Sequence, residues 1–400
     1  MASARAGLRR RLRVASTHET PPAYIRRLEQ ELDLIRTRNW EEPFTIAAEV
    51  VAWCRANSIA VGPGRGNACG SLVSWALGIT EPDPLRHALY FERFVNPLRA
   101  ALPAYQLDLG GRHFEDAVDH LLHAHAPRAT RVFAHESYGA DYVAAIAIGL
   151  SDIRGQVLTK RQAVDAGHVV LDLFGLRAIN ELDAANVLDI EDPEALAHLG
   201  AGYTDGIPWF DRMVPRRMLA EVQPTCFEEL IAVTALDRPG PQANGTYKRY
   251  LEARITEAER THPVVDRILA NTHGVLLWQE QVMQICHDVA GFDVASCELA
   301  RRNLGKRHVG RLGTRFREGA VERGNDSADA ERIFKRLEAE TGYTYPKAHA
   351  VASGYLTMKL ASQRCRGGTA TVVPIDSRAI VHVDGSIHCE TLATTFRETV

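Results

Sequence analysis

A glycine-rich segment, Val61–Ser71, constrains the fold of this chain more than any other part of its sequence. It contains four glycines and one proline, which exclude a regular helix or strand. An apolar run from Leu72 to Leu77 follows, so the segment is expected to lead into a helix. A turn ahead of a helix N-terminus offers free N–H groups and a positive dipole end to a phosphate, and Arg65 adds a charge. A tight structural connection would use the same residues, so this pattern alone leaves both interpretations open.

Composition narrows the class of protein. The 400 residues are 46% apolar and 24% charged, which gives room for a sizeable core in one large or two ordinary domains. The net charge of −3 provides no overall field that favours DNA, so DNA binding would require a local basic face. Seven scattered cysteines without a CxxC pair fit a reduced compartment, and no stretch of 18 apolar residues predicts a membrane span. We therefore expect a cytoplasmic protein with no membrane contact.

Local patterns predict several elements. Residues 22–38 and 44–56 have the apolar spacing of amphipathic helices. Residues 113–125 also have the pattern of a helix, and the four histidines in this range fit a partly solvated face better than a zincin or zinc-finger signature. The arginine-rich residues 1–20 are expected to form a basic tail that either frays or touches phosphate. Residues 380–389 alternate about an Asp-Gly pair, which predicts a type I′ hairpin in a divergent C-terminal tail, 361–400.

The sequence motifs of the glycine-rich segment and its surroundings resemble those of the palm in the bacterial DNA polymerase III alpha subunit family. The resemblance rests on GPGRGNACGSLVSWALGIT, on Asp83-Pro84-Leu85 and on FERFVNP. It implies an α+β fold, with a nucleotidyltransferase-like palm at 21–177 and a mainly helical fingers region at 178–360. It further implies template-directed DNA synthesis from deoxynucleoside triphosphates on a primer–template, in contact with other replisome proteins.

The family's catalytic aspartates are only partly kept. An alignment without gaps puts Ala104 and Gln106 where the family has the first two aspartates that hold its magnesium ions. Asp108 matches the third aspartate of that motif, and Asp172 matches the metal-binding aspartate of a later palm strand, VVLDLFGLR. Alanine offers no ligand and the glutamine carbonyl is neutral, whereas two-metal phosphoryl transfer needs several carboxylates. We therefore expect Asp172 and Asp108 to be the catalytic remnants, Mg²⁺ binding at Asp172 to be doubtful, and catalysis to be impaired.

The resemblance also assigns anion-binding residues. In the glycine-rich segment and the fingers, the positions that match nucleotide and phosphate contacts are Gly64, Arg65, Gly66, Asn67, Ser71, Arg301, Arg302, Lys306, Arg307, Lys347 and His349. A further motif of the family is matched weakly, at Ser137-Tyr138-Gly139. Two positions at which the family has cationic side chains are occupied here by Ala144 and Ile148. For the charge run on 301–307, a solvated helix face is the alternative.

Three functional hypotheses follow. The first is the family activity, weakened by the lost aspartates. The second is a non-catalytic relative that binds DNA, nucleotide or a replisome protein, and the third is the product of a decaying gene. The family's N-terminal phosphoesterase-like domain, which would precede the palm, is expected to be missing. The thumb is also expected to be missing, because only 63 residues separate Asp108 from Asp172.

Overall fold

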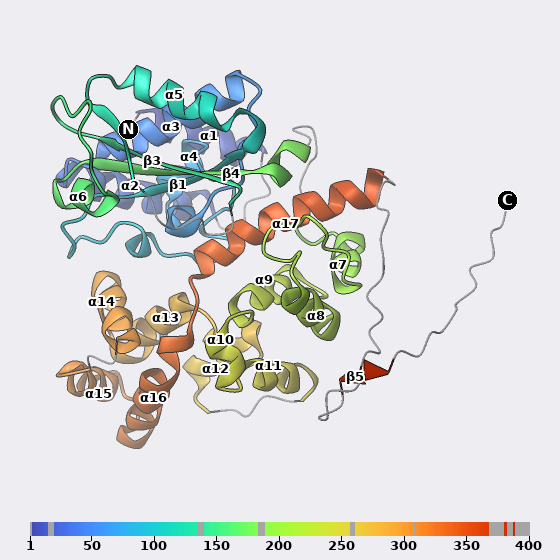
Figure 1. Cartoon of the computed structure of the whole chain (residues 1–400). Helices are drawn as coiled ribbons and strands as arrows, with labels where there is room; N and C mark the ends of the chain where they lie inside the picture. The colour runs from blue at the N-terminus through green and yellow to red at the C-terminus, as the bar shows by residue number, and fades with distance from the viewer. Residues whose placement is uncertain are drawn as a thin grey trace.

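The computed structural model describes residues 2–14, 20–133, 140–182, 189–256, 261–306, 309–367, 380–381 and 387–388. It consists of a sheet region and a helical region, with one long helix between them (Figure 1). The predicted mixed α+β fold, with a palm-like sheet and helical fingers, is confirmed. Among the helices that the structure describes, none has the length and apolar character needed to cross a bilayer. The motif Ser137-Tyr138-Gly139 lies outside the described residues.

The sheet region is built on four strands in the order β1-β4-β3-β2, with β1 parallel to β4 and the other neighbours antiparallel. The strands are β1 (Tyr105–Gly110), β2 (Ala129–Val132), β3 (Tyr142–Ile148) and β4 (Val169–Leu176). The helices are α1 (Ala2–Val14), α2 (Pro21–Thr37), α3 (Glu41–Ala56), α4 (Leu72–Ala76), α5 (Phe114–Ala124) and α6 (Lys160–Asp165), with the 3₁₀ turns η1 (Gly66–Gly70), η2 (Phe91–Arg93) and η3 (Gly111–His113).

The two faces of the sheet have different roles because side chains alternate along each strand. On one face, Leu107 of β1 and Leu171 and Leu173 of β4 join a large core with the helices α1 to α5. On the other face, the same strands carry Gln106 and Asp172, which are paired in the β1–β4 register. The polar face is therefore left for the functional site.

The helical region supplies the opposite wall of that site. Its helices are α7 (Pro193–Gly200), α8 (Met213–Val222), α9 (Phe227–Leu236), α10 (Pro239–Ala243), α11 (Thr246–Ile255), α12 (Pro263–Leu269), α13 (Gln279–Ala290), α14 (Val294–Gly305), α15 (Leu312–Glu322), α16 (Ser327–Glu340) and α17 (Lys347–Gly367), with the 3₁₀ turns η4 (Arg177–Glu181), η5 (Ala270–Thr272) and η6 (Thr341–Tyr343). Figure 1 shows α17 running along the boundary of the two regions, where it packs on η1, α7 and α9.

The N-terminal tail prediction is corrected by the structure. Residues 2–14 form helix α1, which packs on α4 with Ala4 and Leu8 buried. Arg5 also forms an ion pair with Glu29 of α2, at 2.6 Å between Nη2 and Oε2. The arginines on the other faces obscure this short apolar stripe in the sequence, so the segment looks like a solvated tail.

The C-terminal predictions hold in part. The boundary expected at residue 361 falls inside α17, which continues to Gly367. The strands β5 (Ile380–Val381) and β6 (Ile387–His388) pair antiparallel, as the hairpin prediction requires. Val381 pairs with Ile387, however, whereas a two-residue turn at Asp384-Gly385 would pair Val381 with His388. The predicted two-residue register is therefore wrong, and the turn itself lies outside the described residues.

Candidate functional site

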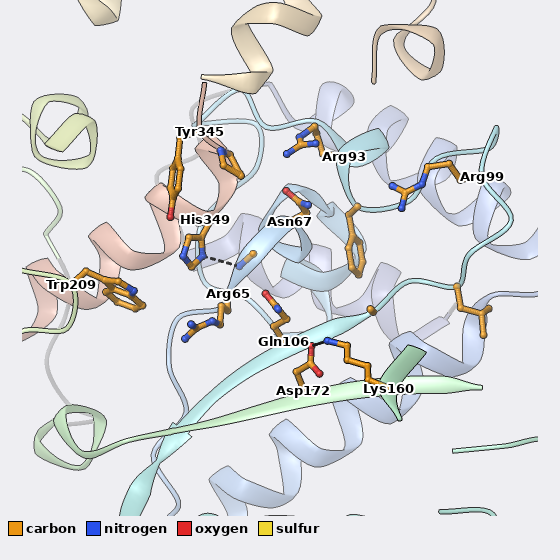
Figure 2. Close-up of a pocket in the computed structure, with 15 residues that line it drawn as sticks. Arg65, Asn67, Arg93, Arg99, Gln106, Lys160, Asp172, Trp209, Tyr345 and His349 are labelled. Atoms are coloured by element: carbon orange, nitrogen blue, oxygen red, sulfur yellow. Dashed lines mark hydrogen bonds and ion pairs between the residues drawn. The ribbon is translucent and has the colours of Figure 1, made fainter. Parts of the chain in front are cut away.

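A cavity of about 640 Å³ lies on the polar face of the sheet, between the sheet region and the helical region. Figure 2 shows Gln106 and Asp172 side by side on one wall, with Lys160 directed at Asp172 and His349 facing Arg65. The residues that line the cavity are Arg65, Gly66, Asn67, Arg93, Phe94, Arg99, Leu102, Ala104, Gln106, Lys160, Asp172, Trp209, Tyr345, Pro346 and His349.

The glycine-rich turn lies against this cavity in a conformation that needs glycine. Gly66 has φ of +63°, and a Cβ there would lie 2.7 Å from Oε1 of Gln106. Its N–H is already bound, because it donates to Nδ1 of His349 at 3.3 Å. Gly64 has φ of +126° and is buried away from the cavity beside Cys69. Of the two glycines predicted to bind phosphate, only Gly66 therefore lines the site.

The expected free helix N-terminus after the turn is corrected by the structure. Glu31 of α2 is buried and accepts hydrogen bonds from the backbone N–H groups of Leu72 at 3.0 Å and Val73 at 3.1 Å. Its carboxylate also accepts from the hydroxyl of Ser71 at 2.9 Å. Ser71 is fully buried and caps α4 by accepting from the N–H of Ser74. This helix end is filled by a protein carboxylate, so Ser71 does not reach a ligand.

Arg65 and Asp108 form a buried pair behind the turn. Nη1 of Arg65 lies 2.7 Å from Oδ1 of Asp108, and both side chains are 2% exposed. The guanidinium also lies over the ring of Phe174, 4.1 Å from its centroid. Burial raises the pKa of Asp108, while the charge of Arg65 opposes this rise. Asp108, predicted as a catalytic remnant, is therefore turned toward Arg65 and does not line the cavity.

Asp172 faces the cavity but does not have the ligand set that a pair of magnesium ions requires. Its register partner is Gln106, and its carboxylate is bound by the ammonium of Lys160. Ala104 lies at the same wall without a ligand atom. Among the described residues, no group of three or more histidine, cysteine or acidic side chains could hold a metal ion. Mg²⁺ favours several oxygen ligands, carboxylates above all, so these residues do not fit the family's metal centre.

Two arginines near the cavity share one buried carboxylate. Glu298 of α14 is 1% exposed and lies 3.0 Å from Nη1 of Arg93. It also accepts from Arg301, at 2.8 Å from Nε and 3.0 Å from Nη2. Arg301, predicted to bind phosphate, is thus held by an ion pair within its own helix. Nε of Arg93 is buried and has no hydrogen-bond partner among the described residues.

The remaining basic residues differ in their partners. The side chain of Arg99 lines the cavity and makes no hydrogen bond or ion pair with any residue that the structure describes. Burial lowers the pKa of Arg99, and the neighbouring Arg302 charge lowers it further. Lys306 is exposed at the end of α14, and Arg307 lies outside the described residues. Arg302, predicted to bind phosphate, does not itself line the cavity, but its charge acts on Arg99, so an anion bound at Arg99 would reduce the repulsion between them.

Lys347 and His349 both lie at the start of α17, but they differ in whether they line the cavity. Nζ of Lys347 lies 3.2 Å from Oε1 of Glu228, and the side chain is 11% exposed, so Lys347 does not line the cavity. His349 does line it. Burial, together with the Arg65 charge, lowers the pKa of His349 to about 4. The imidazole is therefore neutral at physiological pH, which lets Nδ1 accept the Gly66 N–H.

The neutral His349 predicts an acid-sensitive fold. The unfolded chain protonates this histidine near pH 6.5, whereas the folded chain does so only near pH 4. The contribution of this group to the free energy of unfolding is therefore complete above pH 6.5 and falls as the pH drops toward 4. The expected loss is about 2 kcal/mol, which is less than the full pKa shift would give, because the ring partly reaches the cavity. In urea titrations at several pH values, His349→Asn should keep an acceptor and lack this component. Identical pH profiles for the two proteins would contradict the prediction.

Several cavity residues were not identified from the sequence. Arg99, Lys160 and Trp209 line the site, yet none of them lies in a sequence motif from which ligand binding was expected. Lys160 was detectable in principle, because Thr159 and Gln162 have capping-box spacing and the chain has only six lysines. Trp209 has φ of +70°, a strained conformation that is typical of functional sites. No local signal in the sequence reveals that strain.

Comparison with known families gives two adjacent matches. Residues 2–154 match the model of the bacterial DNA polymerase III alpha NTPase domain, and residues 168–324 match that of the bacterial DNA polymerase III alpha subunit finger domain.

Curated relatives agree with these matches. DNA polymerase III subunit alpha of Haemophilus influenzae is 27% identical over 448 residues, covering 84% of this chain and 39% of that protein. The Aquifex aeolicus protein is 25% identical, with 88% and 41% covered, and the Thermus aquaticus protein is 27% identical, with 86% and 37% covered. The chain thus spans about two fifths of these relatives. Since 448 exceeds 400, the Haemophilus protein carries residues in this region that have no counterpart here.

Proposed function

This chain belongs to the family of the bacterial DNA polymerase III alpha subunit, and we propose that its cavity binds the triphosphate of a deoxynucleotide beside DNA. Its template-directed synthesis is impaired, because the carboxylates that would hold two metal ions are replaced. The observation that carries this proposal is a cavity with four cationic side chains and, among its described lining residues, a single carboxylate that is already paired.

The lining of the cavity supports a nucleotide ligand. Arg65, Arg93, Arg99 and Lys160 surround a space that could hold a polyphosphate, and arginine matches phosphate oxygens with paired N–H groups. The rings of Trp209 and Tyr345 could stack on a base. Oδ1 of Asn67 is buried and has no hydrogen-bond partner among the described residues, so it could accept a bond from a ligand.

The same lining argues against fast phosphoryl transfer. Two-metal catalysis stabilises both the attacking and the leaving oxygen, and this requires several carboxylates around the ions. Asp172 is the one carboxylate among the described residues that line this cavity, so that requirement is not met. Loss of several kcal/mol of transition-state stabilisation corresponds to a rate about a thousandfold lower.

Nucleotide binding is the first test of this proposal. Replacing Arg99 and Arg302 together by alanine should weaken binding of a fluorescent deoxynucleoside triphosphate about tenfold or more, because the cavity loses the Arg99 guanidinium and the nearby Arg302 charge. Fluorescence anisotropy of the purified chain measures this effect. The control is Arg9→Ala with Arg10→Ala, which removes two exposed charges of α1. Equal affinity of the two double variants would contradict the proposed site.

Primer extension is the second part of the test. The native chain should extend a primer about a thousandfold more slowly than an alpha subunit that keeps all three aspartates. Binding to primer–template should weaken as salt rises, because cations on the protein replace counterions on DNA. Magnesium-dependent extension at the rate of such a relative, lost on Asp172→Asn, would overturn the claim of impairment.

A further inference from the structure

The acidic side chain that faces the cavity already carries a cation that belongs to the protein. The ammonium of Lys160 contacts Oδ2 of Asp172, and the Asp172 side chain is 5% exposed whereas that of Lys160 is 37% exposed. Lys160 thus covers the carboxylate on the side that a ligand or an ion would approach. Figure 2 shows the two side chains meeting beside Gln106.

The chain places Lys160 by local structure on α6. Thr159 and Gln162 form a capping box, in which the Thr159 hydroxyl oxygen accepts from the Gln162 N–H and Oε1 of Gln162 accepts from the Thr159 N–H. Ala163 is buried under the sheet with Val170, which fixes the face of the helix that is turned to β4. Arg161, the next residue, points to solvent with 91% of its side chain exposed. The lysine position is therefore determined by packing as well as by charge.

We propose that Lys160 takes the place of a divalent metal ion at Asp172, so that the cavity binds its polyphosphate ligand without metal. This inference rests on the proposed function and deepens it. An ammonium group has three N–H donors, and the Asp172 bond uses one of them. The other donors, with the Arg65 and Arg99 guanidiniums, can bind phosphate oxygens. The neutral neighbours Ala104 and Gln106 fit such a site, since they leave no further carboxylate to repel a phosphate.

The test compares nucleotide affinity with and without metal. Binding of a fluorescent deoxynucleoside triphosphate to the native chain is measured by anisotropy in excess EDTA and in excess magnesium. Affinity in EDTA should equal or exceed that in magnesium, because magnesium neutralises phosphate charges that the protein binds directly. Tenfold tighter binding in magnesium would overturn the inference while the proposed function stands. No binding under either condition would overturn both.

Variants identify the residue responsible. In EDTA, Lys160→Ala should weaken binding about tenfold, since a charge-assisted hydrogen bond is lost and Asp172 is left to repel the ligand. The matched control is Arg161→Ala on the same helix, which should bind like the native chain. Unchanged affinity of Lys160→Ala would contradict the role of the lysine.

A second variant guards against misfolding. Lys160→Met combined with Asp172→Asn removes both charges, so no unpaired carboxylate is left at the cavity wall. This double variant should fold with native circular dichroism and still bind the nucleotide less tightly than the native chain in EDTA. Native affinity of the double variant would show that the lysine does not hold the ligand.

Discussion

Replacing Ala104 and Gln106 together by aspartate is expected to give this chain a melting temperature that depends on magnesium. Gln106 lies opposite Asp172 in the β1–β4 register, and Ala104 lines the same wall. Three carboxylates around the single ammonium of Lys160 would repel one another and destabilise the folded state by about 1–3 kcal/mol. Magnesium at about a hundred times its dissociation constant would then restore about 2.7 kcal/mol. Differential scanning calorimetry with and without magnesium measures both effects.

The control for this experiment has the same shape without the charge. Replacing Ala104 and Gln106 together by asparagine adds side chains of equal size, and its melting temperature should not respond to magnesium. The native chain should also be insensitive. A magnesium response of the native chain equal to that of the aspartate variant would mean that Asp172 already binds metal, in conflict with its pairing to Lys160.

The change Glu298→Gln is expected to lower the free energy of unfolding by about 3–5 kcal/mol. Glu298 neutralises Arg93 of η2 and Arg301 of α14, and all three side chains are largely buried. Glutamine keeps one oxygen, and its amide group would face guanidinium donors, so Arg301 would lose its paired carboxylate and Arg93 would keep only the more distant Glu280, at 3.9 Å. Chemical denaturation at neutral pH measures the loss.

A matched surface pair serves as the control for that loss. Glu331 pairs with Arg317 where both side chains are more than a third exposed, and Glu331→Gln should change stability by less than about 1 kcal/mol. Similar losses for Glu298→Gln and Glu331→Gln would refute the view that burial makes the Glu298 ion pairs more important for stability than an exposed pair.

Local patterns in the sequence predicted the elements that carry their own signal. The apolar run around Asp172 becomes strand β4, and the two amphipathic patterns become α2 and α3, with ends within a few residues. The ungapped alignment placed Gln106 at a metal position of the family, and the structure places it opposite Asp172. These inferences work because a strand or helix expresses its burial pattern over neighbouring residues.

Partners that are distant in the sequence could not be predicted in this way. Glu31 fills the helix end at Leu72, and His349 binds the N–H of Gly66 from 283 positions away. Neither contact leaves a local pattern. The Arg301 pair is an exception, since Glu298 lies three residues earlier on the same helix face, a spacing that favours an ion pair. Reading the arginine run as an anion surface passed over that nearer carboxylate.

The buried Glu31 carboxylate has a consequence for how a ligand would be received. Because it satisfies the first amides of α4 from inside the protein, the turn from Gly66 to Ser71 keeps its shape when no phosphate is present. The receiving surface is thus assembled during folding, and an arriving nucleotide would not have to supply the free energy for ordering it. A nucleotide would bind to a preformed surface, and the heat-capacity change of binding would come almost entirely from the surface area buried in the contact.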